Sequence, residues 1–385
     1  MVYLDSAATS FPKAPGVTEA VCEHVATVAG SAGRGAHTFA VAADKLLWDL
    51  RRELASLLGT REITRWAMML NATDAINTAL KGFLRPGDHV LASALEHNAV
   101  ARPLRHLEDN LGVGVTKLPY VPGLGASPTD ICKLVQPNTR LVVLVHASNV
   151  TGEILPIREL AIAAHDFDVP VLIDATQSAG ALPLQIDAWG LDMVAITGHK
   201  ALLGPQGTGA LYVRPGLDLT PLRQGGTGSW SELDRHPDEW PDKMESGTMN
   251  GPGLAGLLAA LQWLRERTIK DIRRHEVEVM DHLLHSLADI PGVAIYGTRT
   301  AADRAGLVSI NVAEMDPADV AAALEDQGIL TRAGLHCAPW AHEAQATLRR
   351  GTLRLSVGPF TTRDDIDAMT AALAPLGRTA TLLGH

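Results

Sequence analysis

The sequence predicts an α/β protein with a mostly parallel, doubly wound sheet and a smaller α+β domain at its C-terminal end. Two observations carry this prediction. In the first half of the chain, short apolar runs of strand length alternate with longer runs of helical period. The short runs are rich in Val, Ile and Leu throughout, as strands covered by helices on both faces must be. At 385 residues, the chain is long enough for two domains.

Six runs are predicted as strands of the large sheet. They are residues 65–70, 88–92, 141–146, 169–174, 193–197 and 209–213. Helices are expected between them, for example over 74–81 and over 157–167, where the apolar side chains share one stripe. Alternation of this kind requires crossover connections and therefore parallel strands.

The rest of the chain supplies longer helices and the smaller domain. An amphipathic helix is predicted over 39–58, capped by Gly59, and a long helical run over 253–288. The last third predicts a strand (306–312), a helix (317–327) with Asp316 as N-cap, a strand (352–357) and a helix (363–376). We expect a large domain over 16–257 and a small domain formed by 1–15 plus 258–385.

Composition argues against several classes of protein. The formal net charge is -10, so no basic surface for a nucleic acid or an anionic membrane is expected. Neither a CxxC pair nor a Cys/His pair at metal spacing is present, which argues against a structural zinc site. The first residues lack the features of a signal peptide, and the apolar stretches are too short to span a bilayer. We therefore expect a cytoplasmic protein.

The three cysteines differ in their surroundings. Cys22 and Cys132 lie in apolar helical runs and are predicted to pack in the core. Cys337 lies in a loop, 334–339, with a histidine directly before it and an arginine nearby, surroundings that favour a thiolate. An inert loop cysteine is the alternative for Cys337.

Mostly polar residues end or follow the predicted strands. They are Asn71, Ala72, Thr73, Glu96, His97, Asn98, Asn149, Asp174, Gln177, Thr197, His199 and Lys200. Because ligands of open α/β sheets bind beyond the carboxyl ends of the strands, these groups are expected to meet in one crevice.

Taken together, these residues indicate a pyridoxal phosphate site. Ala72 and Thr73 open a helix, whose free N–H groups suit a phosphate. Asp174 could pair with a protonated pyridine nitrogen, and Lys200 could form a Schiff base with an aldehyde. His97 could stack on the ring. Taken singly, each has an ordinary alternative: a capping Thr, a turn-capping Asp, a solvated Lys or a structural His.

Short motifs in a recognisable order span nearly the whole chain. They lie at residues 4–9, 71–77, 96–98, 148–152, 173–177, 197–200, 245–248, 332–339 and 353–356. In the set and order of these motifs, the chain resembles the class V aminotransferase family. Within that family it resembles the second group of cysteine desulfurases, with selenocysteine lyases as near relatives. The resemblance implies fold type I with a seven-stranded sheet, and pyridoxal 5′-phosphate as cofactor. It also implies L-cysteine as substrate; a selenocysteine lyase or another carbon–sulfur lyase is the alternative.

The resemblance assigns roles to the cofactor site. Lys200 resembles the lysine that bonds to the cofactor and later moves protons, and Asp174 resembles the partner of the pyridine nitrogen. Gln177 resembles the donor to the phenolic oxygen, and His97 the stacking histidine, which is also a candidate for moving protons. The implied phosphate cradle is Ala72, Thr73, Thr197 and His199. Thr248 resembles a residue that reaches the phosphate of a second subunit, which implies a homodimer.

The resemblance also assigns the substrate and sulfur groups. Asn149, beside the cofactor, and Arg354 resemble the residues that hold the substrate carboxylate; a surface ion pair is the alternative for Arg354. Cys337 resembles the catalytic cysteine that receives sulfur as a persulfide and passes it to an acceptor protein or small molecule. Leu335 stands where many relatives have a second histidine. With Trp340 and the segment 224–243, it departs from the family pattern.

Overall fold

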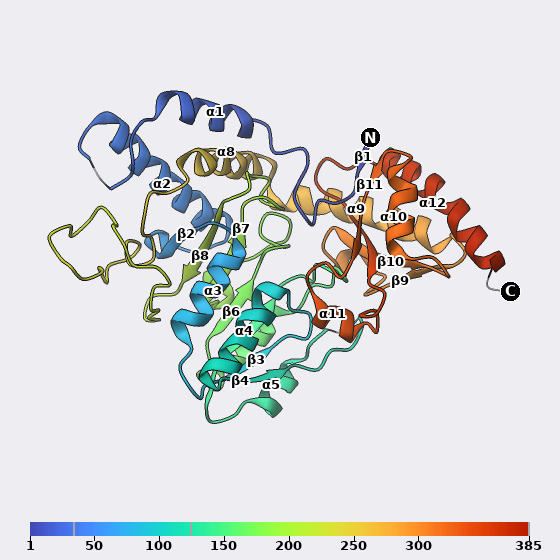
Figure 1. Cartoon of the computed structure of the whole chain (residues 1–385), viewed down its shortest axis with the longest axis horizontal. Helices are drawn as coiled ribbons and strands as arrows, with labels where there is room; N and C mark the ends of the chain where they lie inside the picture. Colours follow the sequence, from blue (N-terminus) through green and yellow to red (C-terminus); the bar gives the residue numbers. More distant parts are fainter. Residues whose placement is uncertain (34, 124, 384–385) are drawn as a thin grey trace.

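The computed structural model describes residues 1–33, 35–123 and 125–383 and builds them around a large sheet (Figure 1). The strand order is β2 (Trp66–Met69), β8 (Gly209–Val213), β7 (Met193–Thr197), β6 (Val171–Asp174), β5 (Thr139–Val145), β3 (His89–Ala92) and β4 (Gly114–Lys117). Neighbours are parallel except at β8, which is antiparallel to both β2 and β7. The predicted mostly parallel, seven-stranded sheet is confirmed.

Each of the six predicted runs overlaps one of these strands. The seventh strand, β4, was not predicted. Its sequence, Gly-Val-Thr-Lys, lies at the edge of the sheet with no fully buried residue. An edge strand needs no continuous apolar run, because only one of its sides is paired.

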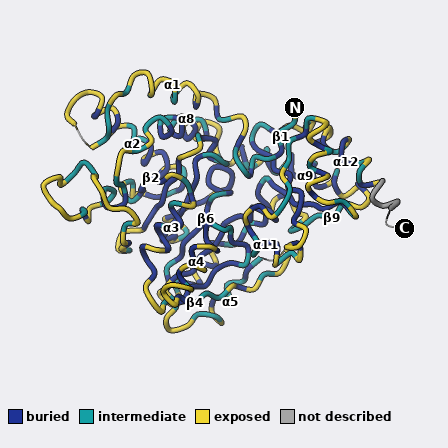
Figure 2. The backbone as a smooth tube through the Cα atoms, in the orientation of Figure 1, coloured by how far each residue is buried: buried dark blue, intermediate teal, exposed yellow. Residues whose placement is uncertain are grey.

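Helices cover both faces of the large sheet. On one face lie α2 (Thr38–Leu57), α6 (Ile157–His165) and α8 (Gly251–Arg267), and on the other α3 (Ala72–Phe83) and α4 (Asn98–Leu111). Alternate residues of β5 divide between two apolar clusters: Val142 and Leu144 join the first, Leu141 and Val143 the second. Figure 2 shows β2 and β6 as buried backbone. The shorter helices are α1 (Val17–Thr27), α5 (Pro128–Leu134) and α7 (Ile186–Trp189).

The C-terminal third forms a second, antiparallel sheet. Its order is β12 (Arg332–Gly334), β13 (Thr352–Ser356), β10 (Leu307–Val312) and β9 (Val293–Ile295). The helices α9 (Ile269–Ala288), α10 (Pro317–Glu325), α11 (Pro339–Ala344) and α12 (Arg363–Leu383) accompany it. The strand β1 (Val2–Tyr3) pairs in parallel with β11 (Ile329–Leu330), and Leu4 joins the apolar cluster of this part. The N-terminus therefore packs against the C-terminal third, although the exact domain boundaries stay a prediction.

The single helical run expected over 253–288 is wrong. Two helices, α8 and α9, are separated at Thr268, whose φ is 63°. The Thr268 hydroxyl accepts a hydrogen bond from the N–H of Asp271 at 3.2 Å and so caps α9. The apolar periodicity continues through the break, which explains why the pattern alone did not mark it.

The expectation that Cys22 and Cys132 fill the core is also wrong, because both are exposed. The helix α1 buries only Val17, and α5 buries only Ile131. Cys132 follows Ile131 directly, so the helical turn of about 100° per residue directs it away from the buried side. Separately, no helix in the described ranges is long and apolar enough to cross a membrane.

Gly209 allows β8 to approach the end of β2. A Cβ at this position would lie 2.7 Å from the Cα of Asn71, the residue that caps α3. We expect Gly209→Ala to lower the free energy of unfolding by about 2 kcal/mol, since backbone must move to admit the methyl group. Chemical denaturation measures this loss. Gly225→Ala is the control, because its Cβ would meet the Ser246 side chain at an ordinary 3.5 Å; equal losses would contradict the prediction.

Candidate functional site

A cavity with an empty volume of about 750 Å³, part of it open solvent, lies where the large-sheet strands end. We call it the site cavity. The predicted residues that line it are Ala72, Thr73, His97, Asn149, Thr197, His199, Lys200, Cys337 and Arg354. They come from segments spread over most of the chain, and the parallel strands bring them together as expected.

The N-terminus of α3 forms one wall. Asn71 caps this helix by accepting a hydrogen bond from the N–H of Asp74 at 2.9 Å, and the backbone of Ala72 and Thr73 then opens onto the cavity. Thr197 and His199 line the same cavity. The Nδ1 atom of His199 is buried without a hydrogen-bond partner. Free N–H groups at a helix N-terminus, with hydroxyl and imidazole groups nearby, suit a phosphate.

His97 is a neutral imidazole beside Asp174. Its Nδ1 accepts a hydrogen bond from the N–H of Ala99 at 3.0 Å, so its proton resides on Nε2. Burial lowers the pKa of His97 to about 4, although the nearby Asp174 opposes the shift. Asp174 ends β6 and is buried; its Oδ1 accepts from the N–H of Thr176 at 2.9 Å. A flat neutral ring and a carboxylate therefore lie close together at the end of the sheet.

Lys200 is half-buried at the cavity, and its Nζ makes no hydrogen bond to any described residue. Removal from water lowers the pKa of Lys200 to about 8, and the positive charge of Arg354 adds to the effect. The amine is therefore neutral in an appreciable fraction of molecules near neutral pH. Only the neutral form attacks a carbonyl, so this lysine suits the formation of a Schiff base.

Arg354 is not a surface ion pair, because it is only 2% exposed. Its Nη2 lies 2.9 Å from Oδ1 of Asp5, and its Nη1 donates to the carbonyl of Asn149 at 3.1 Å. The Nε of Arg354 and the Oδ1 of Asn149 are buried without partners. Unpaired buried polar atoms are costly, so a ligand that satisfies them is favoured here. A carboxylate is the natural partner of the free guanidinium N–H.

Cys337 lies in a short loop that other parts of the site hold in place. His336 and Cys337 both have positive φ, 48° and 56°. Asn149 Nδ2 donates to the His336 carbonyl at 2.7 Å, and the N–H of Asn98 donates to the Cys337 carbonyl at 2.7 Å. The Cys337 side chain itself is exposed and lines the site cavity. The thiol is thus presented to the cavity by a fixed backbone.

His336 does not supply the positive charge that its position beside Cys337 suggested. Its Nε2 lies 3.1 Å from both the carbonyl and the hydroxyl of Thr352. Burial, followed by the charge of Arg354, holds the pKa of His336 far below its ordinary range, so the ring is neutral. Two arginines, Arg332 and Arg354, line the site cavity together with Cys337.

Comparison with known proteins agrees with this geometry. The profile of the Aminotransferase class-V family matches residues 2–369. The chain belongs to the class V aminotransferase family. A probable cysteine desulfurase of Halalkalibacterium halodurans is 31% identical over 401 residues, which cover 100% of this chain and 94% of that protein. A probable cysteine desulfurase of Methanothermobacter thermautotrophicus is 32% identical over 382 residues, covering 97% and 94%.

Solved structures extend the likeness to three dimensions. The apo cysteine desulfurase of Thermococcus onnurineus NA1 superposes with a TM-score of 0.91 at 27% identity, covering 98% of this chain and 95% of that chain. The cysteine desulfurase CsdA of Escherichia coli superposes with a TM-score of 0.86 at 28% identity, covering 98% and 94%. The fold-type I architecture expected of a class V aminotransferase is therefore confirmed.

Three of the predicted residues do not line the site cavity. Gln177 lines a neighbouring cavity, and its Nε2 donates to the carbonyl of Ala7 at 3.0 Å. Thr248 lines a third cavity with Arg223 and Ser246, away from Lys200. A role of Thr248 in the site of a second subunit stays a prediction. Asp174 also does not line the cavity and lies buried behind it.

Sequence reasoning missed several residues of the site. Asp5 and Ala7 belong to the motif at residues 4–9 but received no role, and Arg332 was noted only as an arginine near Cys337. Asp5 pairs with Arg354 across 349 positions of the chain, a contact that no spacing in the sequence announces. Glu96 was noted only as a polar residue after a strand, and it proves to be fully buried.

Glu96 is expected to make folding stability depend on pH. Its Oε1 accepts from the Ser93 hydroxyl at 2.5 Å and the Val145 N–H at 2.6 Å, while Oε2 has no partner. Burial raises the pKa of Glu96 to about 8, so the native state keeps a proton that the unfolded state releases above about pH 4.5. The stability that this group contributes is full below that value and is lost as the pH rises toward 8.

Glu96→Gln removes this titration. We compare the unfolding free energy of Glu96→Gln with that of wild type at each pH. Between pH 5 and 8, the variant should gain about a few kcal/mol over wild type, because only wild type loses the contribution of the protonated Glu96. Urea denaturation at several pH values measures the difference. Glu23→Gln, at an exposed position, is the control and should show no such trend. A difference for Glu96→Gln that stays constant with pH would show that Glu96 titrates normally.

Proposed function

We propose that this protein is a pyridoxal-phosphate-dependent cysteine desulfurase, which converts L-cysteine to L-alanine and leaves the sulfur as a persulfide on Cys337. The observation that carries the proposal is the shared cavity of Lys200, Arg354 and the exposed Cys337. The match to relatives named cysteine desulfurases over nearly the whole chain supports it.

The residues of the site fit pyridoxal 5′-phosphate. The phosphate would take the N–H groups of Ala72 and Thr73, and the unpartnered Nδ1 of His199 would face it. Asp174 would hold the proton of the pyridine nitrogen, and the neutral ring of His97 would stack on the pyridine. When bound, this group supplies an aldehyde that condenses with amines and a ring that accepts electrons.

Each residue then has a defined task with L-cysteine. Arg354 Nε, a donor without a partner in the structure, orients the substrate carboxylate, and Asn149 can offer the same carboxylate the second N–H of its Nδ2, whose other N–H donates to the His336 carbonyl. Lys200 Nζ, with its lowered pKa, removes the proton from Cα. His97 carries its proton on Nε2 and is placed to move a proton at the substrate.

Cys337 performs the sulfur step. Its thiolate attacks the substrate sulfur, an S–S bond forms and the substrate Cβ–S bond breaks. The electron pair of that bond stays with the substrate carbons, which take up protons and leave as alanine. Carbon is reduced and sulfur is oxidised to the persulfide level, so the step needs no external oxidant. The exposure of Cys337 leaves the persulfide open to a sulfur acceptor.

Product analysis tests the proposal. The purified holoenzyme is incubated with L-cysteine and, in parallel, with L-selenocysteine, and alanine and pyruvate are quantified. We expect alanine from L-cysteine and no pyruvate. Pyruvate with ammonia would identify a carbon–sulfur lyase, and alanine from selenocysteine alone would identify a selenocysteine lyase; either result would overturn the proposal.

We also propose that the protein is a homodimer. The large exposed side chains Trp48, Leu222, Trp230 and Leu233 lie on α2 and on the long connection between β8 and α8. Figure 2 shows much of this connection as exposed backbone. A second subunit that covers these side chains would remove their apolar surface from water. Sedimentation equilibrium distinguishes the dimer from a monomer, which would contradict it.

A further inference from the structure

A second cavity adjoins the site cavity and has no task in the proposed reaction. Its empty volume is about 520 Å³, which includes solvent at its mouth. It shares only Ala7 and Lys200 with the site cavity, and none of His97, Cys337 or Arg354 lines it. Its walls come from the N-terminal segment, the loops after β6 and β7, the helix α9 and the loop after β13. We call it the inner cavity.

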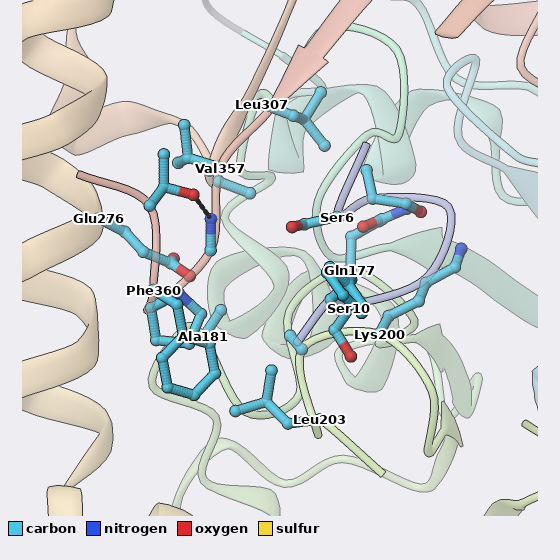
Figure 3. Close-up of a pocket in the computed structure, with 18 of the residues that line it drawn as sticks. Ser6, Ser10, Gln177, Ala181, Lys200, Leu203, Glu276, Leu307, Val357 and Phe360 are labelled. Carbon is cyan, nitrogen blue, oxygen red and sulfur yellow. Dashed lines mark hydrogen bonds between the residues drawn. The ribbon is translucent and has the colours of Figure 1, made fainter. Parts of the chain in front are cut away.

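The inner cavity contains an unpartnered carboxyl group. Glu276 of α9 is only 4% exposed, and its Oε2 has no hydrogen-bond partner. Arg273 lies one turn earlier on the same helix, yet it forms no ion pair with Glu276 within the part of the chain that the structure describes. Figure 3 shows Glu276 and Phe360 on one side of the cavity, with Ser6, Ser10 and Lys200 on the other. A buried carboxyl without a partner is destabilising, so its presence at a cavity indicates a ligand.

The remaining wall mixes apolar and polar groups. Its large apolar side chains are Phe11, Leu203, Leu307, Val357 and Phe360, and its polar side chains include Ser6, Ser10 and Gln177. A Cβ at Gly306 would lie 3.5 Å from Cδ of Glu276. The apolar side chains would contact an apolar body, and aromatic rings also attract a cation placed over their faces.

We propose that the inner cavity binds a small organic cation with an apolar body, whose N–H groups hydrogen-bond to the carboxylate of Glu276. An anion would meet the ionised carboxylate as a like charge, whereas a cation adds a charge interaction that a neutral compound bound to the protonated carboxyl lacks. The other charged group at the cavity is Lys200, on the opposite wall, and it is a base of lowered pKa. This inference does not depend on the proposed desulfurase activity.

Proton release gives the site a signature. Burial raises the pKa of Glu276 to about 8, and the positive charge of Arg273 opposes the shift. A cation binds the ionised carboxylate, so below pH 8 binding must release the proton of Glu276. The affinity is therefore expected to rise about tenfold or more from pH 6.5 to 8.5 and then to level off. His275, also on α9, is hydrogen-bonded to the carbonyl of Thr361 at 2.9 Å and so is directed to another partner.

Calorimetric titration of the holoenzyme with benzamidine tests the proposal. Benzamidine is a planar apolar cation with N–H donors, and unlike a primary amine it does not readily form an imine with an aldehyde. We expect it to bind at least about tenfold more tightly than benzamide or benzoate, which have the same ring with a neutral or an anionic group. Glu276→Gln should weaken benzamidine binding by about tenfold or more. Glu278→Gln, which removes the same charge from an exposed position of α9, should not.

Several results would overturn the proposal. They are absence of benzamidine binding at millimolar concentration, equal binding of benzamide or benzoate, or unchanged affinity in Glu276→Gln. Should Glu276→Gln fail to fold, the wild-type protein still decides the matter. Titrations at pH 7 in two buffers of different ionisation enthalpy are expected to reveal release of nearly one proton, and binding without proton release would refute the role of Glu276.

Discussion

Lys200→Ala is expected to lower alanine formation from L-cysteine by about 10³-fold or more, because it removes both the covalent anchor of the cofactor and the base at Cα. Reduction with borohydride fixes an imine between lysine and an aldehyde, so mass analysis of the digested protein detects the linkage directly. The wild-type peptide that contains Lys200 should carry the reduced cofactor, and the variant should carry none.

The matched control is Lys45→Ala, since the Lys45 side chain is 71% exposed and belongs to an i,i+4 ion pair on α2. This variant should keep both the reduced adduct and the activity of wild type. A borohydride-stable adduct that survives in Lys200→Ala would show that another lysine holds the cofactor, and the cavity would then need reassignment.

Cys337→Ser is expected to keep the cofactor and to lose alanine formation by about 10²-fold or more. A serine hydroxyl is nearly isosteric with the thiol, so the loop held by Asn98 and Asn149 should be retained. It is not ionised near neutral pH and does not accept sulfur from a thiol, whereas a thiolate does. Steady-state assays of alanine, with the visible absorption of the cofactor recorded in parallel, separate loss of chemistry from loss of binding.

The chain provides two controls for this experiment. Cys22 and Cys132 are also exposed, but they lie on α1 and α5 and do not line the site cavity. Cys22→Ser and Cys132→Ser should therefore leave alanine formation unchanged. Full activity in Cys337→Ser, or a loss of similar size in either control, would refute the assignment of Cys337 as the sulfur carrier.

The large sheet was predictable because its central strands must be apolar on both faces. Because of this requirement, β5, β6 and β7 each consist of a continuous run rich in Val, Ile and Leu. The predicted bounds of all three strands lie close to the observed ones. The elements that escaped prediction are governed by other interactions. The edge strand β4 carries no such run, and the break between α8 and α9 depends on the backbone of Thr268 rather than on hydrophobic pattern.

The site was predictable where its residues follow strands, because topology alone brings the strand ends together. Ala72, Asn149 and Lys200 were placed in one cavity for that reason. Contacts between distant loops obey no such rule. The pair of Asp5 and Arg354 joins the N-terminus to β13, and the burial of Glu96 and Glu276 depends on packing that no local pattern encodes.

The charge state of a histidine could not be predicted from the sequence either. A histidine beside a cysteine indicates an activated thiol when only the sequence is read. In the structure, burial against Thr352 and the neighbouring Arg354 keep His336 neutral, so it fixes the loop rather than supplying charge. The cationic side chains that line the cavity with Cys337 include Arg332 of β12 and Arg354 of β13.

Mass analysis of Cys337 after a brief exposure to L-cysteine tests the central claim most directly. The holoenzyme is mixed with L-cysteine in the absence of reductant, trapped with an alkylating reagent and digested. The peptide that contains Cys337 is predicted to gain the mass of one sulfur atom, which a reductant removes, while the Cys22 and Cys132 peptides do not change. Alanine formed in stoichiometric excess, with the Cys337 peptide free of added sulfur throughout, would contradict the account.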